Sequence, residues 1–562
     1  MQFDDQKQQS RLDELYKREE EDLVRILAER YNVSYLDLTA VSVNTDALKL
    51  IPEATAREAG VAAFLINGKK LNLVVISPKN DKVDVILDDL KRAGYEIMLY
   101  MGSKRTLEKA WDMYKEISLA AETQGGVFDI SATAVRDSIS QIKDIAGLKQ
   151  LLAGIANETN RYKISKILEV ILGGAIAIGA SDVHFEPEEK QVRLRFRLDG
   201  VLQDFTVFKN ETFHFLLSRI KLLSGLKLNI KETAQDGRFS IKLETGEIEI
   251  RTSMLPGEYG ESIVLRILNP ENINVSFESM GIEPILFAIL EKEVLKPNGM
   301  ILTTGPTGSG KTTTLYAFMR KVYTPEIKII TIEDPIEYHL QGISQTQVNK
   351  AKDYTFLNGL RSALRQDPDI IMVGEIRDGE TAEVAVNSAL TGHLVFSTLH
   401  TNDAAGVIPR LIDLGVNPKI ISSALNISLA QRLVRKLCQT CKKEDRPDPK
   451  ERALIEHTIE TIKQKRDIVL DPSKVWRAKT TENTCPACNG LGYKGRIGIF
   501  EAILTDRAVE DVIVTSNPSA REIKKAAIPQ NILDMREDGI IKVLSGITSL
   551  DELRRVVDLE AV

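Results

Sequence analysis

Hydrophobic and polar positions change their period along the chain and predict three α/β domains. In residues 1–31, leucine, isoleucine and tyrosine recur at near-helical spacing among many charges, which predicts an amphipathic helix with a solvated face. From Val33 to Tyr114, short β-rich runs alternate with helical runs. We therefore expect a small N-terminal α/β domain over residues 1–115. A role in interaction is favoured, because no catalytic constellation stands out there.

The next segment, residues 116–160, is expected to be a linker that contains a helix. Gly125, Gly126 and several polar stretches interrupt the hydrophobic pattern, which would let the first domain move relative to the rest. A helical run from Ile164 to Ile178 then opens a second α/β domain, expected over residues 161–272.

Apolar and basic residues alternate strictly from Val192 to Leu198, in the order Val-Arg-Leu-Arg-Phe-Arg-Leu. This period predicts a strand whose arginines share one face of a sheet, and Asp199-Gly200 predicts a tight turn into the next strand. Two interpretations of the basic face stand side by side: a face with a function, and a solvated face with weak surface ion pairs.

Residues 273–562 carry strand-like runs that alternate with helical runs, which predicts a parallel sheet with crossover helices. The four runs are Gly299 to Thr303, Ile327 to Ile332, Ile370 to Val373 and His393 to Thr398. In open sheets of this kind, functional side chains gather where the strands end. We expect the chemistry of this region at that edge.

Composition places the chain among globular proteins. Its 562 residues suggest three or four domains at about 150 residues each, and 43% hydrophobic with 27% charged residues is typical of a folded chain. The net charge of −6 disfavours a protein that coats nucleic acid, so we expect no nucleic-acid partner. No apolar run is long enough to predict a membrane span, and the acidic N-terminus does not resemble a signal peptide. A cytoplasmic location follows.

A glycine-rich motif follows the first strand-like run of the third region. Gly-Pro-Thr-Gly-Ser-Gly-Lys-Thr, residues 305–312, matches the pattern G-x-x-x-x-G-K-[ST] and leads into a helical run. Lys311 is expected to reach the β- and γ-phosphates of ATP, and the Thr312 hydroxyl to bind Mg²⁺. The alternative is a plain glycine turn. The predicted nucleotide-binding residues are Gly305, Thr307, Gly308, Ser309, Gly310, Lys311, Thr312 and Thr313.

Acidic residues follow two of the other strand-like runs. Glu375 comes directly after the apolar strand that ends in Val373 and Gly374, in a Walker B arrangement, and is the first choice for polarising the attacking water. Glu333 is the first of a cluster of acids at the end of the apolar strand Ile327 to Ile332, and it is expected to reach Mg²⁺ or its water shell. The alternatives are a helix cap for Glu375 and an acidic surface loop for Glu333.

Two of the six histidines, His393 and His400, bound a single strand. Either side chain could hydrogen-bond the γ-phosphate or a catalytic carboxylate. A structural role is the alternative, and by spacing alone it is favoured for His393.

Arginines supply candidates for the cation that stabilises the transition state. Arg361 and Arg365 lie four residues apart on an expected helix, and Arg377 follows Glu375 closely. Three further arginines of the second domain could act as arginine fingers presented by a neighbouring subunit. They are Arg238, Arg251 and Arg266.

Four cysteines form two C-x-x-C pairs: Cys438 with Cys441, and Cys485 with Cys488. Four thiolates are the expected ligands of a structural Zn²⁺, which predicts a zinc subdomain over about residues 436–492. The long intervening segment does not prevent closure, because its entropic cost rises only logarithmically with length. Free buried cysteines and a redox pair are the alternatives.

Taken together, these motifs resemble one family. The resemblance is carried by Ala180 to Pro187, Arg195 to Leu202, Gln235 to Arg238, the loop at 305–314, the acidic loop from Thr331 to Tyr338, Gly374-Glu375, the histidine segment and both cysteine pairs. From about Tyr35 onward the chain is similar to the type II/type IV secretion ATPases, especially those that assemble and extend type IV pili.

The resemblance implies an architecture and a set of partners. The fold would be α/β and multidomain, with a RecA-like P-loop NTPase core, a preceding PAS-like α/β domain, the small N-terminal α/β domain and the zinc subdomain. Nucleotide would lie between the second and third domains of a homohexamer. Domain closure would act on an inner-membrane platform protein and pilus assembly proteins, giving peripheral membrane association at the inner face of the cytoplasmic membrane.

The resemblance also implies roles for single residues. Glu375 matches the Walker B glutamate and Glu333 the glutamate of the acidic loop, while His393 and His400 match the histidine box. Arg251 and Arg266 match arginines that approach the phosphates, and Arg238 is a weaker match. Relatives that bind cyclic di-GMP carry an Arg-Leu-Gly repeat near the N-terminus, whereas Arg11-Leu12-Asp13-Glu14 stands here. The sequence therefore leaves open whether the N-terminal domain binds that regulator.

Several functions follow from this combination. The first is a hexameric motor ATPase that hydrolyses ATP to power pilin assembly. A type II secretion or competence pseudopilus ATPase is the second, because the motor chemistry is shared. A nucleotide-binding assembly scaffold with little turnover belongs to another class, and the complete Walker motifs disfavour it. A helicase is disfavoured by the acidic net charge.

Overall fold

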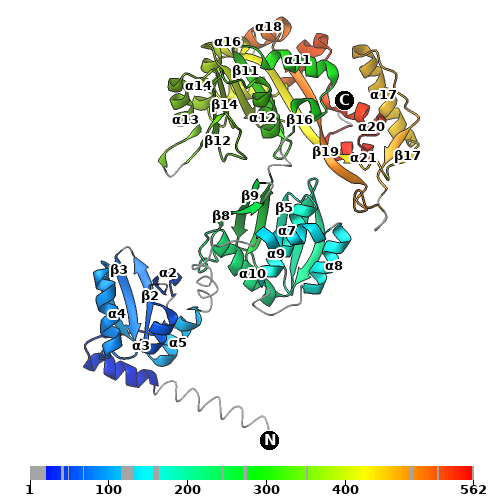
Figure 1. The fold of residues 1–562 in the computed structure, drawn as a ribbon. Helices are drawn as coiled ribbons and strands as arrows, with labels where there is room; N and C mark the ends of the chain where they lie inside the picture. The colour runs from blue at the N-terminus through cyan, green and yellow to red at the C-terminus, as the bar shows by residue number, and fades with distance from the viewer. Residues whose placement is uncertain are drawn as a thin grey trace.

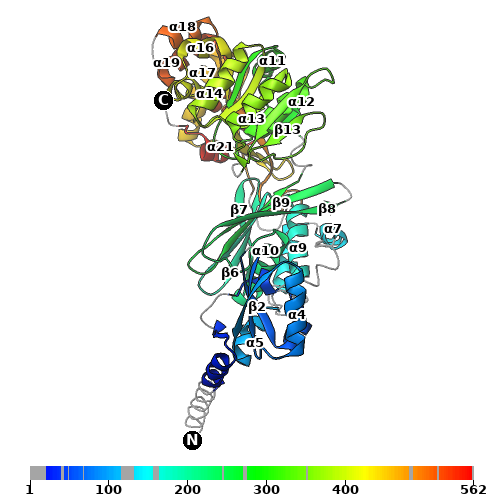
Figure 2. The same ribbon diagram turned by 90° about the vertical axis from the view of Figure 1, so that its left-hand side faces the viewer.

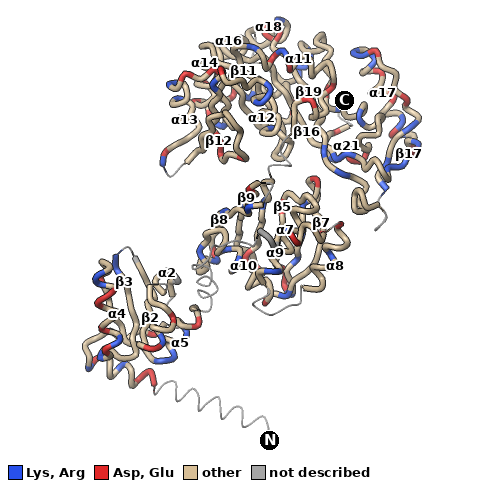
Figure 3. Tube along the Cα trace, viewed as in Figure 1, with Lys and Arg blue, Asp and Glu red and all other residues tan. Residues whose placement is uncertain are grey.

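The computed structural model describes residues 20–38, 43–48, 50–67, 69–114, 132–142, 144–155, 164–243, 246–269, 275–349, 352–479, 485–515 and 518–559. These residues form three α/β domains that follow one another along the molecule (Figure 1, Figure 2). Basic and acidic positions are interspersed over all three (Figure 3). Among the described helices, none has both the length and the apolar character needed to cross a membrane.

The N-terminal domain is built on a four-stranded sheet in the order β1-β4-β3-β2. Its elements are β1 (Ser34–Tyr35), α2 (Thr45–Leu48), α3 (Glu53–Ala59), β2 (Val61–Asn67), β3 (Lys70–Val75), α4 (Asp81–Arg92), β4 (Glu96–Met101) and α5 (Lys104–Asp112). The expected small α/β domain is confirmed. Residues 20–30 are helical and bury Val24 and Ala28 against Met101, while residues 1–19 of the expected helix lie outside the described residues.

The second domain is a six-stranded antiparallel sheet in the order β7-β6-β5-β10-β9-β8. Its strands are β5 (Asp182–Pro187), β6 (Val192–Leu198), β7 (Val201–Phe208), β8 (Gln235–Leu243), β9 (Gly246–Leu255) and β10 (Ser262–Leu268). The strict alternation in β6 buries its apolar residues and leaves its arginines half-buried on the other face. The predicted turn is also present, because Asp199 and Gly200 both have positive φ angles, of 47° and 86°.

Four helices accompany this sheet: α7 (Ala132–Gln141), α8 (Ile145–Ile155), α9 (Ile164–Ala177) and α10 (Asn210–Leu223). Two of them, α7 and α8, come from the segment expected to be a linker, yet they pack in the core of the second domain. Gly173 and Gly174 of α9 explain this packing. A Cβ on Gly174 would lie 2.5 Å from a methyl group of Leu148 in α8, and one on Gly173 only 2.7 Å from Cβ of Ser138 in α7.

The third domain is built on a seven-stranded sheet in the order β13-β12-β14-β15-β11-β16-β19. Its strands are β11 (Gly299–Thr304), β12 (Ile329–Glu333), β13 (Ser344–Gln347), β14 (Ile370–Val373), β15 (Leu394–Leu399), β16 (Leu425–Leu437) and β19 (Tyr493–Leu504). All neighbours are parallel except β16 and β19. The four predicted strands are therefore confirmed in a parallel sheet.

Helices cover both faces of this sheet, so its central strands are buried on both sides. Ile301 of β11 packs with α11 (Pro284–Val294) and α12 (Lys311–Val322), whereas Met300 and Leu302 pack in the opposite core. That core includes α13 (Phe356–Ala363), α14 (Gly379–Leu390), α15 (Val407–Asp413) and α16 (Pro418–Ala424). Because these strands are buried on both faces, their ends have fixed positions in the domain, and so do the starts of the loops that follow them.

The C-terminal part of the chain surrounds the cysteine pairs. It contains β17 (Lys443–Asp445), α17 (Pro449–Lys465), β18 (Val475–Arg477), α18 (Arg507–Thr515), α19 (Ala520–Ala527), α20 (Met535–Leu544) and α21 (Leu550–Val556).

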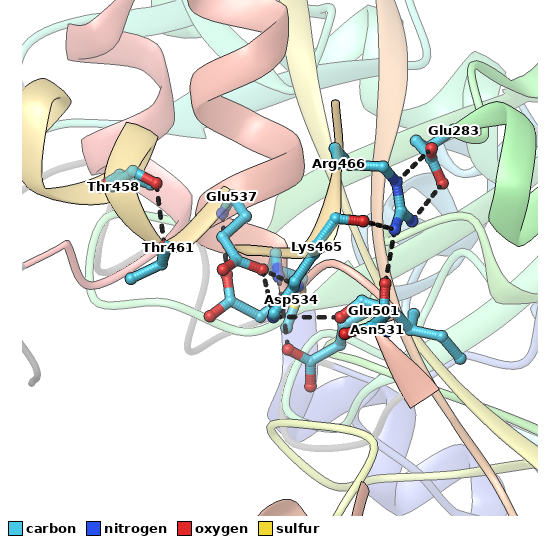
Figure 4. Close-up of polar contacts among 11 residues, drawn as sticks. Glu283, Thr458, Thr461, Lys465, Arg466, Glu501, Asn531, Asp534 and Glu537 are labelled. Atoms are coloured by element: carbon cyan, nitrogen blue, oxygen red, sulfur yellow. Dashed lines mark hydrogen bonds and ion pairs between the residues drawn. The ribbon is translucent and has the colours of Figure 1, made fainter. Parts of the chain in front are cut away.

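Ion pairs fix the end of α17 to the rest of the domain (Figure 4). The Arg466 guanidinium donates to both carboxylate oxygens of Glu283, at 2.9 and 3.0 Å, and to the Asn531 carbonyl at 2.6 Å. Lys465 donates to Glu537 at 2.7 Å. These contacts join the insertion between the cysteine pairs to α11 and α20.

Candidate active site

A cavity of about 830 Å³ lies between the second and third domains. The third domain lines it with residues 306–313, with the acidic loop after β12, and with Glu375 and His400. From the second domain it receives Asp182, Arg197 and Arg266. The structure thus brings the predicted phosphate loop together with charged side chains from two domains.

The glycine loop between β11 and α12 has the backbone shape that phosphate binding requires. Gly305, Gly308 and Gly310 have φ angles of 142°, 79° and 92°, a region that side-chain-bearing residues rarely adopt. A Cβ on Gly305 would lie 2.6 Å from the Gln431 carbonyl oxygen, so a larger residue does not fit. The free N–H groups at the start of α12 favour an anion at this position.

Two side chains of this loop fit a bound triphosphate. The Ser309 hydroxyl is buried and has no hydrogen-bond partner among the described residues. The Lys311 amino group donates to the carbonyls of Gly305 and Pro306, at 2.8 and 3.2 Å, and so lies across the loop. Burial lowers the pKa of Lys311, while the negative charge of Glu375 opposes this change. The loop can therefore hold the phosphates of a nucleotide, with Thr312 at the first turn of α12 as a candidate Mg²⁺ ligand.

Gln431 of β16 binds the glycine loop and the following helix through its side-chain amide. Its side-chain oxygen accepts a hydrogen bond from the Thr314 hydroxyl at 2.8 Å, and its amide nitrogen donates to the Ser309 carbonyl at 2.7 Å. Only 1% of Gln431 is exposed. This buried amide fixes the loop to the helix that follows it, a role that the sequence did not predict.

Glu375 lies at the end of β14 and faces the cavity, with 14% of its side chain exposed. It forms an ion pair with Arg377, and this hydrogen bond raises the pKa of the arginine. Nε2 of His400 lies 3.6 Å from its other carboxylate oxygen. A carboxylate at this strand end, beside the phosphate loop, is placed to orient a water molecule.

Glu333 also borders the cavity, but its carboxylate is almost fully buried, with 2% of the residue exposed. It accepts hydrogen bonds from the hydroxyls of Thr331, at 2.5 Å, and of Tyr316, and from the Gln345 amide at 3.1 Å. Burial raises the pKa of Glu333, and the three donors oppose this change. Both oxygens are engaged by protein groups, so any action on Mg²⁺ would pass through a change in these contacts.

His393 and His400 lie at opposite ends of β15. His400 follows β15 at the edge of the phosphate loop and lines the cavity. His393 precedes β15, where its Nδ1 lies 3.0 Å from the Ser388 carbonyl and its own carbonyl accepts from Gly299 at the start of β11. The structure brings only His400 of this pair to the site, because a strand separates the two side chains.

The predicted arginines of the second domain form a row across its sheet. Arg238 pairs with Arg251, Arg251 with Arg266, and Arg266 with Asp182 in direct cross-strand register. Direct cross-strand neighbours share one face. Arg197, which also lies opposite Asp182, extends the row.

The members of this row differ in their contacts. Arg266 lines the cavity and lies 3.1 Å from Asp182. Arg251 reaches the third domain, where it donates to Glu337 at 3.0 Å and to the Ile336 carbonyl at 2.5 Å. Arg238 is 68% exposed and does not line the cavity. In the third domain, Arg377 lines the cavity, whereas Arg361 and Arg365 do not.

The four cysteines form one cluster. Their Sγ atoms lie within 4.8 Å of one another, with 3.8 Å between Cys438 and Cys485 and 3.6 Å between Cys441 and Cys488. Thiolates about 2.3 Å from a tetrahedral Zn²⁺ lie about 3.8 Å apart, so the set fits zinc. Cys438 follows β16 directly, which connects the cluster to the strand that holds the phosphate loop.

Fold and site together define a class. A RecA-like parallel sheet with a glycine loop after one strand, and a carboxylate at the end of a neighbouring strand, is the arrangement of P-loop nucleotide hydrolases. A family model described as Type II/IV secretion system protein matches residues 157–555. The chain belongs to this family, and it is an ATPase. A second model, the MshEN domain, matches residues 31–121. The segment from Arg11 to Glu14 lies outside the described residues.

Individual relatives agree with this assignment. The chain is 42% identical over 439 residues to Type II secretion system protein E of Pseudomonas aeruginosa, covering 78% of this chain and 81% of the relative. It is 36% identical over 538 residues to the type IV pilus assembly ATPase PilB of Myxococcus xanthus, covering 95% and 91%. The fold is similar to the crystal structure of the ATPase DotB of Yersinia pseudotuberculosis, with a TM-score of 0.50 at 18% identity, over 71% of this chain and 94% of that one.

Proposed function

We propose that the chain is the motor ATPase that powers pilin assembly, that is, type IV pilus extension. The observation that carries this proposal is the extent of the similarity to the Myxococcus xanthus pilus assembly ATPase. It covers 95% of this chain and 91% of the relative, and so includes the N-terminal domain as well as the ATPase core.

The proposed chemistry assigns a role to each group at the cavity. The phosphate loop from Gly305 to Thr313 binds the phosphates of ATP, and Lys311 neutralises part of their charge. Glu375 orients the attacking water, with His400 holding the carboxylate in place. Bound Mg²⁺, held by the Thr312 hydroxyl and indirectly by Glu333, would supply further charge neutralisation.

The second domain would contribute the closing movement. Arg266 lines the cavity, and Arg251 contacts the acidic loop of the third domain. A rotation between the two domains would therefore move these arginines relative to the phosphate loop. In a homohexamer, some of these arginines could reach the nucleotide of a neighbouring subunit. Arg238 suits this role best, because it is exposed at the end of the row. His393 would then have a structural role.

The proposed motor works in the cytoplasm at the inner face of the membrane, through an inner-membrane platform protein and the pilus assembly proteins. Zn²⁺ in the cysteine cluster would give the C-terminal part a fixed shape for such contacts. A type II secretion or competence pseudopilus motor is the second candidate, favoured by the 42% identity to the Pseudomonas aeruginosa secretion protein.

One experiment separates these candidates. In cells that naturally express the chain, a chromosomal Glu375→Gln substitution should abolish surface pili while the level of the protein stays unchanged. Glu383→Gln, an exposed change on α14, is the matched control. Intact pili together with loss of exoprotein secretion would overturn the pilus proposal and support the second candidate.

A further inference from the structure

Arg432 of β16 lies against the phosphate loop of its own chain. Its guanidinium lines the cavity, and Nη1 lies only 3.1 Å from the point that a Cβ on Gly305 would occupy. Two carbonyl oxygens hold the side chain: Gln431 accepts from Nη1 at 3.0 Å and Asn402 accepts from Nη2 at 2.7 Å. The guanidinium is therefore fixed by the core of the third domain and does not depend on the second domain.

The charge of Arg432 is not balanced by a carboxylate. Four of the other five arginines that line the cavity pair with a carboxylate: Arg197 and Arg266 with Asp182, Arg377 with Glu375, and Arg555 with Glu552; the fifth is Arg496 of β19. Arg432 forms no ion pair with a carboxylate in the described part of the chain, although it is half-buried.

The two acids that act electrostatically on Arg432, Glu501 and Asp403, bind other groups. Glu501 is buried and accepts a hydrogen bond from the Ala404 N–H at 2.8 Å, and Asp403 pairs with Lys524 at 2.7 Å. A guanidinium carries five N–H donors, and two carbonyls use only part of them. The remaining donors, and a positive charge with no carboxylate in direct contact, favour an anion.

A second cation stands beside it. Burial lowers the pKa of Lys311, and the positive charge of Arg432 lowers it further against the effect of Glu375. Two cations that share one partly buried site repel each other, and a polyphosphate between them removes this repulsion. The backbone of the same loop is already shaped for phosphate.

We propose that Arg432 binds the phosphate chain of the nucleotide from within the same subunit, as a second cationic contact beside Lys311. The inference rests on the ATPase activity of the family and not on the pilus role. Because Arg432 belongs to the rigid core, it acts before any domain closure. It should therefore strengthen binding of both ATP and ADP, whereas arginines of the second domain act only in the closed state.

The test is a calorimetric titration of the full-length chain with Mg-ADP and with a nonhydrolysable Mg-ATP analogue. Arg432→Gln should raise both dissociation constants about 10- to 100-fold, since it removes charge-assisted hydrogen bonds. Arg432→Lys keeps the charge and loses the planar fork, so it should give an intermediate value. Lys436→Gln, an exposed lysine on the same strand, is the matched control and should bind as the wild type does.

The melting temperature of the nucleotide-free protein separates binding from a structural role. Relief of the repulsion with Lys311 should leave it unchanged or raised in Arg432→Gln. Dissociation constants within about twofold of wild type would overturn the inference, as would a parallel loss of stability and affinity in both Arg432 variants. Failure of the wild-type chain to bind either nucleotide would instead contradict the ATPase assignment itself.

Discussion

At the scale of single residues, burial separates the two predicted acids. Glu375 stays open to the cavity beside His400 and Arg377, whereas Glu333 is enclosed by hydroxyl and amide donors. The first is placed to act on a water molecule. The second is placed to hold the end of β12, and with it the acidic loop that Arg251 contacts.

Glu333 should make stability depend on pH. Burial raises its pKa, so the folded chain holds this proton to higher pH than the unfolded chain does. The stabilising contribution is complete below the unfolded pKa and is lost as pH rises through the folded pKa. Glu333→Gln cannot titrate. The melting temperature of the wild type should therefore fall relative to that of Glu333→Gln as the pH rises above the ordinary glutamate pKa of about 4.3.

Thermal unfolding of both proteins across this range is the measurement, with Glu383→Gln as an exposed control. A difference in melting temperature that stays constant with pH would show that Glu333 does not titrate with a raised pKa.

The same scale shows what a sequence reveals about a site. Lys311 and Glu375 could be predicted because each belongs to a local motif at a strand end. Gln431 and Arg432 could not, because their partners lie more than a hundred residues away or on another loop. His393 and His400 look equivalent in the sequence, and only the direction of β15 distinguishes them.

At the scale of elements, β16 is the strand that joins the parts of the third domain. It holds the phosphate loop through Gln431, pairs with β11 and β19, and ends at Cys438. Its sequence shows no strict alternation because eight of its thirteen residues are buried, including the polar Ser428 and Gln431, whose partners are distant in the sequence. The linker segment was expected to contain a helix, but the packing of α7 and α8 in the second domain was not predicted, because the glycines that admit these helices lie in α9.

The cysteine cluster should hold one zinc ion per chain. Elemental analysis by mass spectrometry is expected to give a zinc-to-protein ratio near one for the wild type and near zero for Cys485→Ser. Removal of zinc by a chelator should lower the melting temperature, and added Zn²⁺ should restore it, whereas added Mg²⁺ should not. Protein that lacks zinc yet melts like the wild type would contradict a structural metal site.

The ion pair between Arg466 and Glu283 should contribute strongly to the stability of the third domain. Arg466 is 6% exposed and Glu283 14% exposed, so Arg466→Met leaves the largely buried Glu283 carboxylate with the Leu286 N–H as its remaining donor. The expected loss in the free energy of unfolding is about 3 kcal/mol or more, measured by denaturant titration. Arg452→Met on the same α17 removes an exposed pair with Glu456 and should cost about 1 kcal/mol or less. Equal losses would contradict this account.

At the scale of the whole molecule, the site depends on two domains. The turn at Asp199 accepts a hydrogen bond from the Gly495 N–H at 2.8 Å, and Arg251 contacts the acidic loop. These contacts bring the basic face of the second sheet over the cavity. The sequence predicted the basic face and the loop separately, but their approach depends on domain packing that no local pattern encodes.

The central claim is that this cavity hydrolyses ATP with Glu375 as the residue that orients water. The most direct test is steady-state phosphate release by the purified full-length chain with Mg-ATP. We predict that Glu375→Gln binds ATP but turns it over at least about 100-fold more slowly than the wild type does. Glu383→Gln should match the wild type. A rate for Glu375→Gln close to that of the wild type would contradict the claim, and absence of turnover in the wild type would favour a nucleotide-binding scaffold instead.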